Sequence, residues 1–281
     1  MKIGIDGILV GGYTDENAKS GVTVIVPEVE NTAGISQRGG SPATYGTDLL
    51  RPMHRRNQSI NAIVLTGRSV FGFRAVDAVQ TVLFDQGKGF KITESFKMPI
   101  VAAAAIFDFY DNKILPTVEW GYKAMENLSN EIPVGRQWAG RGATVGKLRG
   151  LNYAKPSGQG YYEVEKNGLR VGVISVVNSI GNIYDESGKL IAGEESEEFN
   201  VTALGTTLGV VITNAKLSNS DACRVANAAE NGFSAVIRPY NLSLDGDTVF
   251  TIATNQIEVS VDKVIALAQR AAMKSVLSIF R

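Results

Sequence analysis

The sequence predicts an α/β protein in which β-sheets lie inside and helices cover them from outside. Strand-length apolar runs recur along the chain, and several are apolar almost throughout instead of alternating. Such runs are typical of strands that are buried on both faces. Helical patterns lie between the runs, and no repeat, low-complexity tract or linker splits residues 1–193. These observations favour one domain over residues 1–281.

Seven segments have the length and composition of β-strands. Each is rich in β-branched and apolar residues, which favour extended backbone. Stacked sheets enclosed by helices would cover both faces of such segments. In chain order the expected strands are Thr23–Val26, Ile60–Thr66, Ile100–Phe107, Val171–Val177, Thr207–Thr213, Ala235–Arg238 and Val249–Thr254.

Three helices are expected between and after these strands. The first covers Phe73–Leu83, where apolar residues recur at spacings of three and four before two glycines. The second begins at Ser218, because Asp221 three residues on gives a capping signature, and it ends at Asn231-Gly232. The third spans Asp262–Phe280, with its apolar residues facing inward.

Overall charge gives no reason to expect nucleic acid or an anionic membrane as a partner. Lys+Arg and Asp+Glu both number 28, so the formal net charge is zero. The opening residues lack the apolar run of a secretory signal, and no apolar stretch approaches the length of a membrane span. We therefore expect a soluble cytoplasmic protein.

The scarcity of histidine and cysteine excludes several kinds of site. The chain has one histidine, His54 in the basic stretch 51–56, and one cysteine, Cys223. A His- or Cys-rich zinc site and an internal disulfide framework are therefore ruled out, and we expect no metal or cofactor. The G-x-S-x-G nucleophile motif is absent as well. Any hydrolase built on this chain needs a base other than histidine, unless His54 is that base.

The bond between Gly205 and Thr206 is the candidate centre of the chemistry. It lies where a strand-like run opens, a few residues after the acidic segment Glu194–Glu198. A threonine hydroxyl is a weak nucleophile, but an N-terminal threonine carries an α-amine that can take its proton. Gly205 leaves its carbonyl open to attack because it has no Cβ. The alternative interpretation is an ordinary Gly-Thr-Thr turn that follows a solvated acidic loop.

Seven stretches spread over the whole chain resemble the DmpA-type aminopeptidase/amidase family of self-processing N-terminal-nucleophile hydrolases, which includes nylon-oligomer hydrolases. Each stretch alone is weak, but their order along the chain makes the resemblance specific. They are Gly21–Pro27, Arg38–Ala43 with Thr47–Leu50, Ala62–Gly67, Gly140–Lys147, Val176–Asn178, Gly205–Thr207 and Asp245–Phe250.

This resemblance implies a four-layer α-β-β-α sandwich of the type that ornithine acetyltransferases share. It also implies autocleavage of one domain into residues 1–205 and a smaller fragment, 206–281, that begins with the nucleophile. Two intertwined fragments would then make up the single domain 1–281.

The family's functional residues fall on five positions of this chain. Thr206 matches the nucleophile. Asp245 and Asp247 match an acidic or hydroxyl pair, and their spacing would place both on one face of a strand, beside the amine and hydroxyl of Thr206. Asn178 matches an oxyanion donor at the end of an apolar strand. Lys147 matches a lysine of the nylon-hydrolase site; a phosphate-loop interpretation of its glycine-rich surroundings fails because the spacing is wrong.

Five positions depart from the family pattern. Gly205 stands where many relatives have Asn before the cut, although the DmpA enzyme itself has glycine there. Phe107 replaces a tyrosine near the site, so any oxyanion role of that tyrosine is lost. Asn241 stands where many relatives have histidine, and Arg68 and Val70 break a pattern of small residues. We expect these changes to reshape the pocket.

The expected function is that of a self-processing N-terminal threonine amide hydrolase acting on short peptides, amides or 6-aminohexanoate oligomers. Two alternatives stay open: a non-catalytic binding protein on the same scaffold, and an acetyltransferase of the ornithine type. The resemblance also implies a homo-oligomer, a tetramer. Large aromatic residues in segments that have the composition of loops favour such an interface: Trp120, Trp138, Tyr161 and Tyr162.

Overall fold

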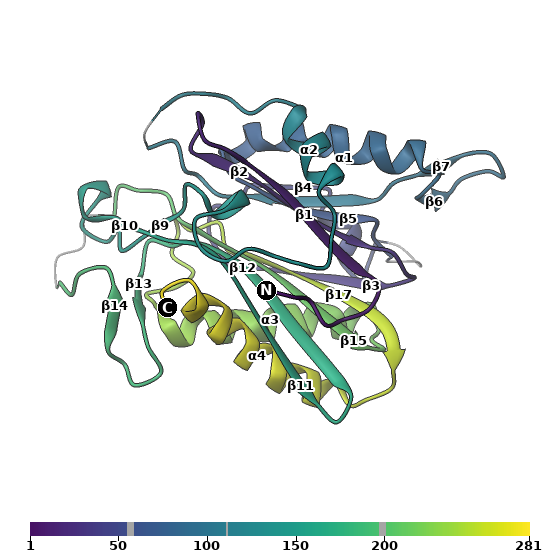
Figure 1. The fold of residues 1–281 in the computed structure, drawn as a ribbon. Helices are drawn as coiled ribbons and strands as arrows, with labels where there is room; N and C mark the ends of the chain where they lie inside the picture. Colours follow the sequence, from purple (N-terminus) through teal and green to yellow (C-terminus); the bar gives the residue numbers. More distant parts are fainter. Residues whose placement is uncertain (55–58, 111, 197–200) are drawn as a thin grey trace.

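Four layers make up the chain, with a pair of helices on each outer side and two sheets between them (Figure 1). The computed structural model describes residues 1–54, 59–110, 112–196 and 201–281. The end of the basic stretch 51–56 and the end of the acidic segment Glu194–Glu198 lie outside these residues. The predicted α-β-β-α sandwich is thereby confirmed.

The first sheet has five strands in the order β1-β2-β5-β8-β4. Helices α1 (Arg74–Asp85) and α2 (Glu119–Glu126) cover its outer face, as Figure 1 shows. Strands β5 and β8 run parallel, and the other neighbours in the sheet are antiparallel. In sheet order the strands span Ile8–Asp15, Ser20–Pro27, Ala62–Thr66, Val101–Ala105 and Thr44–Tyr45.

The second sheet has the order β11-β12-β15-β17-β3 and carries the candidate nucleophile on its central strand. Helices α3 (Asn219–Val236) and α4 (Val261–Ser278) cover its outer face. Strand β15 is antiparallel to β12 and parallel to β17. In sheet order the strands span Gly158–Lys166, Leu169–Asn178, Thr206–Ala215, Thr248–Ile257 and Thr32–Gln37.

Short strands make up three smaller sheets at the margins of the sandwich. The hairpin β6–β7 follows α1, and β9 pairs with β10. Strand β13 pairs with both β14 and β16. Their bounds are Phe90–Lys91 and Lys97–Met98, Thr144–Val145 and Lys155–Pro156, and Asn182–Tyr184, Leu190–Ala192 and Ile237–Arg238.

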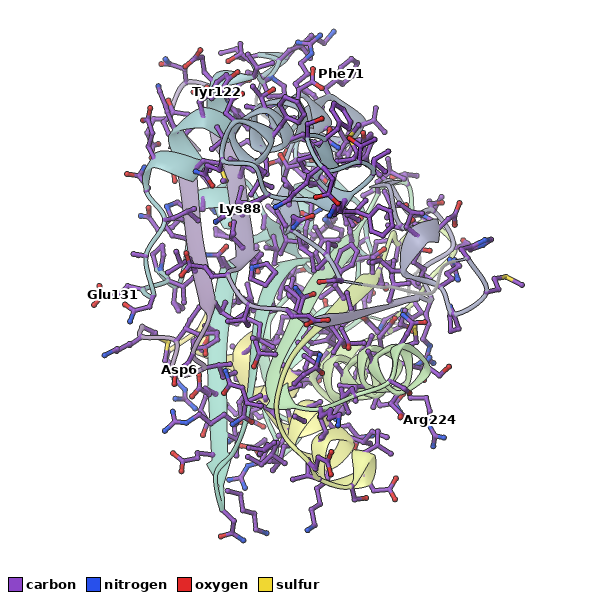
Figure 2. All side chains as sticks on the ribbon, turned by 90° about the vertical axis from the view of Figure 1, so that its right-hand side faces the viewer. Asp6, Phe71, Lys88, Tyr122, Glu131 and Arg224 are labelled. Atoms are coloured by element: carbon purple, nitrogen blue, oxygen red, sulfur yellow. The ribbon has the colours of Figure 1, made fainter. Side chains whose placement is uncertain are left out.

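Three apolar clusters lie between successive layers and explain why the long strands are apolar on both faces. One fills the space between the two sheets and includes Ile63 and Val210. A second lies between the second sheet and its helices, and a third between the first sheet and its helices. Figure 2 shows side chains filling these spaces, with Tyr122 and Arg224 in opposite helical layers. Burial of this kind contributes about 25 cal/mol for each Å² of apolar surface.

Two expectations about local structure are wrong at the end of α3. The helix continues through Asn231-Gly232 to Val236, so only Ile237–Arg238 of the predicted strand Ala235–Arg238 is extended. Gly232 is therefore a contact residue instead of a stop. A Cβ at this position would collide with the carbonyl oxygen of Gln269 on α4, so glycine lets the two helices approach closely.

The aromatic residues expected at a subunit interface pack largely within their own chain. Trp120 lies buried in α2 and donates a hydrogen bond to Asp15 at 3.0 Å. Tyr161 is buried in β11, while Trp138 and Tyr162 pack against the apolar clusters. These rings therefore give no support to an oligomer. Among the described residues, no helix has the length and apolarity needed to cross a membrane.

Candidate active site

Gly205 and Thr206 lie where the chain enters the central strand of the second sheet. Thr206 is the first residue of β15, and Gly205 forms an isolated bridge with Asp245, which precedes β17. The hydroxyl of Thr206 donates a hydrogen bond to the carbonyl oxygen of Gly205. The same oxygen accepts a hydrogen bond from the backbone N–H of Gly246 at 2.9 Å. The nucleophile candidate and a donor for developing negative charge thus meet at one carbonyl.

Gly246 is a functional candidate that the sequence analysis missed. It lies between the two predicted aspartates, and a Cβ there would lie 2.8 Å from the hydroxyl oxygen of Thr206. Its contribution is a backbone N–H, which no side-chain pattern reveals. The Asp-Gly-Asp sequence was the available signal, because a glycine between two site carboxylates allows the backbone to approach the nucleophile.

Glycine at position 205 also has a local reason. A Cβ at this position would collide with the carboxylate of Asp245 and would lie 2.7 Å from both Cγ1 and the backbone nitrogen of Ile180. Close packing around position 205 therefore accompanies the glycine that this chain has where many relatives have asparagine.

Asn178 lies directly opposite Thr206, because the two residues pair across the β12–β15 ladder. Its side-chain amide nitrogen donates to the carbonyl oxygen of Phe107 at 3.0 Å, which occupies one of its two hydrogens. Its side-chain oxygen accepts hydrogen bonds from the backbone N–H of Thr144 and from the ammonium of Lys147, at 3.0 and 3.1 Å. Asn178 thus joins the strand of the nucleophile to Lys147.

Lys147 is fully buried, and its surroundings favour the neutral amine. Its Nζ contacts the backbone oxygen of Asn178 at 2.9 Å and the hydroxyl of Tyr110 at 3.4 Å. Burial lowers the pKa of Lys147 to about 7, although the charges of Asp245 and Asp108 oppose this effect. A buried amine with a pKa near neutrality is suited to accept a proton at physiological pH.

The predicted pair Asp245 and Asp247 is buried beside the scissile junction. Asp247 accepts the backbone N–H of Thr207 at 2.6 Å, and Asp245 accepts the backbone N–H of Ile180 at 3.3 Å. Burial raises the pKa of Asp245, and burial together with the charge of Asp245 raises the pKa of Asp247 well above its usual range. Two adjacent buried carboxyls resist double ionisation unless a cation joins them.

A further buried network extends from Asp247 to helix α3. Asn241 donates to Asp247 through both its backbone nitrogen and its side-chain amide, at 3.1 and 2.9 Å. The same amide donates to Glu230 at 3.2 Å, and the hydroxyl of Tyr240 donates to Glu230 at 3.4 Å. Burial raises the pKa of Glu230. Asn241, at φ 59°, thus links a third buried carboxyl to the site, a role the sequence analysis did not foresee.

A tyrosine hydroxyl is present near the junction although Phe107 cannot supply one. Tyr110, three residues later, donates to the carbonyl oxygen of Leu204 at 3.0 Å and accepts from Lys147. Tyr110 therefore adds a hydroxyl beside the junction, but this hydroxyl donates to the carbonyl of Leu204, so it does not restore the oxyanion role expected to be lost with Phe107. Its position in a loop, without a recognisable motif, hid it from sequence reasoning.

Arg68 is fully buried beside the loop that carries Tyr110. Its Nε lies 4.0 Å from the carboxylate of Asp108, and its guanidinium lies over the ring of Phe109 at 4.6 Å. The carboxylate of Asp108 also accepts hydrogen bonds from the hydroxyl of Ser20 and the backbone N–H of Arg68, at 2.6 and 2.7 Å. Arg68 thus supports the Phe107–Tyr110 segment from the side of the first sheet.

The five predicted site residues are brought together and sealed from solvent. Thr206 is 4 % exposed, and Lys147, Asn178, Asp245 and Asp247 are no more than 1 % exposed. With the chain continuous across Gly205–Thr206, its own backbone occupies the reactive position. The described residues contain no group of three or more His, Cys, Asp or Glu side chains arranged to hold a metal ion.

Two sheets packed face to face and covered by helices on both outer sides give the chain the fold of the N-terminal-nucleophile hydrolases. The chain belongs to peptidase family S58, whose family model matches residues 3–279. It is a hydrolase of amide bonds built on this fold.

Three known proteins illustrate the relationship. An uncharacterized aminopeptidase of Mycobacterium leprae is 33 % identical over 302 residues, covering 94 % of this chain and 81 % of that protein. A 6-aminohexanoate-oligomer endohydrolase of Paenarthrobacter ureafaciens is 25 % identical over 283 residues, covering 92 % and 76 %. The L-aminopeptidase D-Ala-esterase/amidase of Ochrobactrum anthropi has the same fold, with a TM-score of 0.75 at 19 % identity over 98 % of this chain and 84 % of that one.

Proposed function

We propose that the chain cleaves its own Gly205–Thr206 bond and that Thr206 then serves as the N-terminal nucleophile of an amide hydrolase. The observation that carries this proposal is the pair of hydrogen bonds at the carbonyl of Gly205, one from the hydroxyl of Thr206 and one from the N–H of Gly246. The attacking group and an oxyanion donor are already in contact with the bond to be cut.

Self-cleavage proceeds through an ester. The hydroxyl oxygen of Thr206 attacks the carbonyl carbon of Gly205, and its proton passes through water to the neutral amine of Lys147. The C–N bond then breaks, and Lys147 returns its proton through water to the departing nitrogen of Thr206, which becomes a free amine. Water hydrolyses the remaining ester, which leaves a carboxylate on Gly205 and regenerates the hydroxyl.

The new α-amine takes over the role of base in each turnover. It accepts the proton of the Thr206 hydroxyl as that oxygen attacks the carbonyl carbon of a substrate amide. Asp245 and Asp247, which flank the junction in the uncleaved chain, hold this amine when it is protonated. The amine product leaves, and water hydrolyses the acyl ester. These steps use no metal or cofactor.

Short peptides, simple amides and linear 6-aminohexanoate oligomers are the substrates that we assign to this site. Aminopeptidase and 6-aminohexanoate-oligomer endohydrolase are the activities named for its relatives. Lys147, Asn178, Thr206 and the two aspartates are the positions matched to nylon-oligomer hydrolases, and their closeness around one junction supports this assignment.

We also propose a cytoplasmic homotetramer. Exposed apolar side chains gather at the end of α1 and on the β6–β7 hairpin, including Phe84, Phe90 and Phe96, and they offer a surface for association. Light scattering on purified protein tests the assembly, and a stable, fully active particle of about 30 kDa excludes it.

The intact mass of purified protein tests the proposed function. Cleavage converts the 30.1 kDa chain into fragments 1–205 and 206–281, of about 22 and 8 kDa. The two fragments should co-purify and release amine from an amide substrate. A single 30.1 kDa species after prolonged incubation would favour the binding-protein alternative. Addition of ornithine to an acyl substrate separates acyl transfer from hydrolysis.

A further inference from the structure

A cavity of about 540 Å³ lies where the end of β3 meets helices α3 and α4, and no step of the proposed function uses it. Its volume is within the range of pockets that bind small molecules, about 300–1,000 Å³. None of the five candidate site residues lines it. We call it the arginine pocket after three of its lining residues, Arg38, Arg51 and Arg224.

Positive charge dominates the arginine pocket. None of its described lining residues is acidic. The described part of the chain gives the three arginines one ion pair, in which Nε of Arg51 lies 3.4 Å from Asp48, a residue outside the lining. Like charges around one cavity repel one another, and an anion between them replaces that repulsion with attraction. The charges of Arg38 and Arg224 are thus available to a ligand.

Two of the guanidinium groups are held in place by neutral partners. Arg38 donates a hydrogen bond to the side-chain oxygen of Asn231 at 3.0 Å, and Arg51 donates one to the side-chain oxygen of Gln37. An amide oxygen orients a guanidinium group without cancelling its charge. These contacts therefore prepare Arg38 and Arg51 for an anion instead of neutralising them.

Helix α3 supplies the third arginine together with amide groups. Arg224, Asn227 and Asn231 share one face of the helix because they are spaced by three and four residues. Arg224 is exposed and forms no hydrogen bond or ion pair with the other described residues. Figure 2 shows it projecting outward from α3. Its guanidinium group can therefore turn to a ligand without breaking an existing contact.

The chemistry of the lining indicates which ligand fits. Guanidinium groups bind phosphate and carboxylate oxygens through paired, charge-assisted hydrogen bonds. Two arginines without an ion pair match a ligand with at least two negative charges. Further neutral hydrogen-bonding groups complete the walls: Ser36, Gln37, Asn227, Asn231 and Gln269.

We propose that the arginine pocket binds a small polyanion, a molecule that carries two or more phosphate or carboxylate groups. Arg38 contacts it from the end of β3, Arg224 from α3, and Arg51 adds a third positive charge. The pocket is next to the candidate active site but contains none of its reacting groups. The two are joined by the backbone N–H of Arg38, which donates to the backbone oxygen of Asp247 at 3.3 Å.

Isothermal titration calorimetry tests the pocket with inorganic pyrophosphate and with citrate, at constant ionic strength and without divalent metal ions. At least one probe should bind saturably, and the stronger of the two distinguishes a phosphate ligand from a carboxylate ligand. Arg224→Gln should weaken binding by at least about tenfold because it removes a charge-assisted contact. Absence of saturable binding by both probes would overturn the proposal.

Arg270→Gln is the matched control, since Arg270 is exposed on α4 and does not line the pocket. It removes the same charge and should leave the affinity within about twofold of the parent. An equal loss of affinity in both variants would show attraction by general surface charge and would exclude a specific site.

Cys223 reports where the anion binds, because it lines the pocket and is the only cysteine in the sequence. Its alkylation by N-ethylmaleimide, a neutral reagent, can be followed by intact mass. A saturating probe should slow alkylation severalfold in the parent but not, at the same concentration, in Arg224→Gln. An unchanged rate in the parent would place the anion elsewhere and overturn the proposal. Neither measurement requires amide hydrolysis, so the outcome is independent of the proposed function.

Discussion

The ammonium nitrogen of Lys147 lies 3.1 Å from the side-chain oxygen of Asn178, a residue that pairs with Thr206 in the neighbouring strand. The proposed base of self-cleavage and the proposed nucleophile are therefore connected through one amide group. A change in the protonation of Lys147 therefore alters its hydrogen bond to Asn178, the residue that faces the scissile junction.

Replacing Thr206 should remove the chemistry and leave the fold intact. Thr206→Ala should abolish both self-cleavage and hydrolysis because one hydroxyl serves both steps, and Thr206→Ser should retain some of each. Thr207→Val is the matched control, since the buried Thr207 hydroxyl has no hydrogen-bond partner within the described part of the chain. Mass spectrometry and an amide hydrolysis assay measure the outcomes. Turnover of an amide by Thr206→Ala would place the nucleophile elsewhere.

Self-cleavage should become faster as pH rises through about 7. Burial lowers the pKa of Lys147 to about 7, so its charged form dominates below this value and its neutral, proton-accepting form above it. The rate of fragment formation, followed on gels across about two pH units on either side, should rise and then level off.

Lys147→Met should remove this pH dependence and slow cleavage by about 100-fold or more. Lys155→Met is its control, because Lys155 is partly exposed and pairs with Glu194. A pH-independent rate in the unaltered chain would exclude Lys147 as the base.

Tyr110→Phe should slow self-cleavage by about tenfold without preventing it. The lost hydroxyl positions the carbonyl of Leu204, one residue before the bond that breaks, but does not contact the reacting carbonyl. Tyr122→Phe on α2 removes a hydroxyl from a different layer and should leave the rate unchanged. A normal rate in Tyr110→Phe would mean that its hydrogen bond to Leu204 has no part in cleavage.

Gly232→Ala should destabilise the fold although alanine favours helices. The added Cβ meets the carbonyl oxygen of Gln269, and the cost of overpacking should exceed the gain in helix propensity, a net loss of about 2 kcal/mol. Urea unfolding in a Thr206→Ala background compares single chains. Ser234→Ala, exposed on the same helix, should lie within about 0.5 kcal/mol of the parent; an equal effect of both substitutions would contradict the close approach of α3 and α4.

Sequence patterns identified the central strands because those strands are buried on both faces. Strands β12, β15 and β17 follow the predicted segments with small shifts at their ends. Strands β1 and β11 were missed, since glycines and polar residues interrupt their apolar pattern. Packing of the neighbouring strand supplies the missing stability there, and local composition does not reveal it.

The candidate site was predictable where side chains carry the chemistry. The resemblance assigned Thr206, Lys147, Asn178 and both aspartates to one site, and the fold brings these side chains together. The N–H of Gly246 and the carboxyl of Glu230 were not foreseen. The first is a backbone group, and the second reaches the site only through the packing of α3 on the second sheet.

The order of strands in the second sheet determines how cleavage would change refolding. Strands β15 and β17 of the segment 206–281 lie between β12 and β3 of the segment 1–205. Once the junction is cut, reassembly after denaturation is a bimolecular event in which two strands must insert between two others. Before the cut, the same pairing closes a loop within one chain, at a much smaller entropic cost. The cleaved protein would therefore stay folded because it unfolds slowly, and it would not refold readily once unfolded. The sheet would form efficiently only while the chain is uncut.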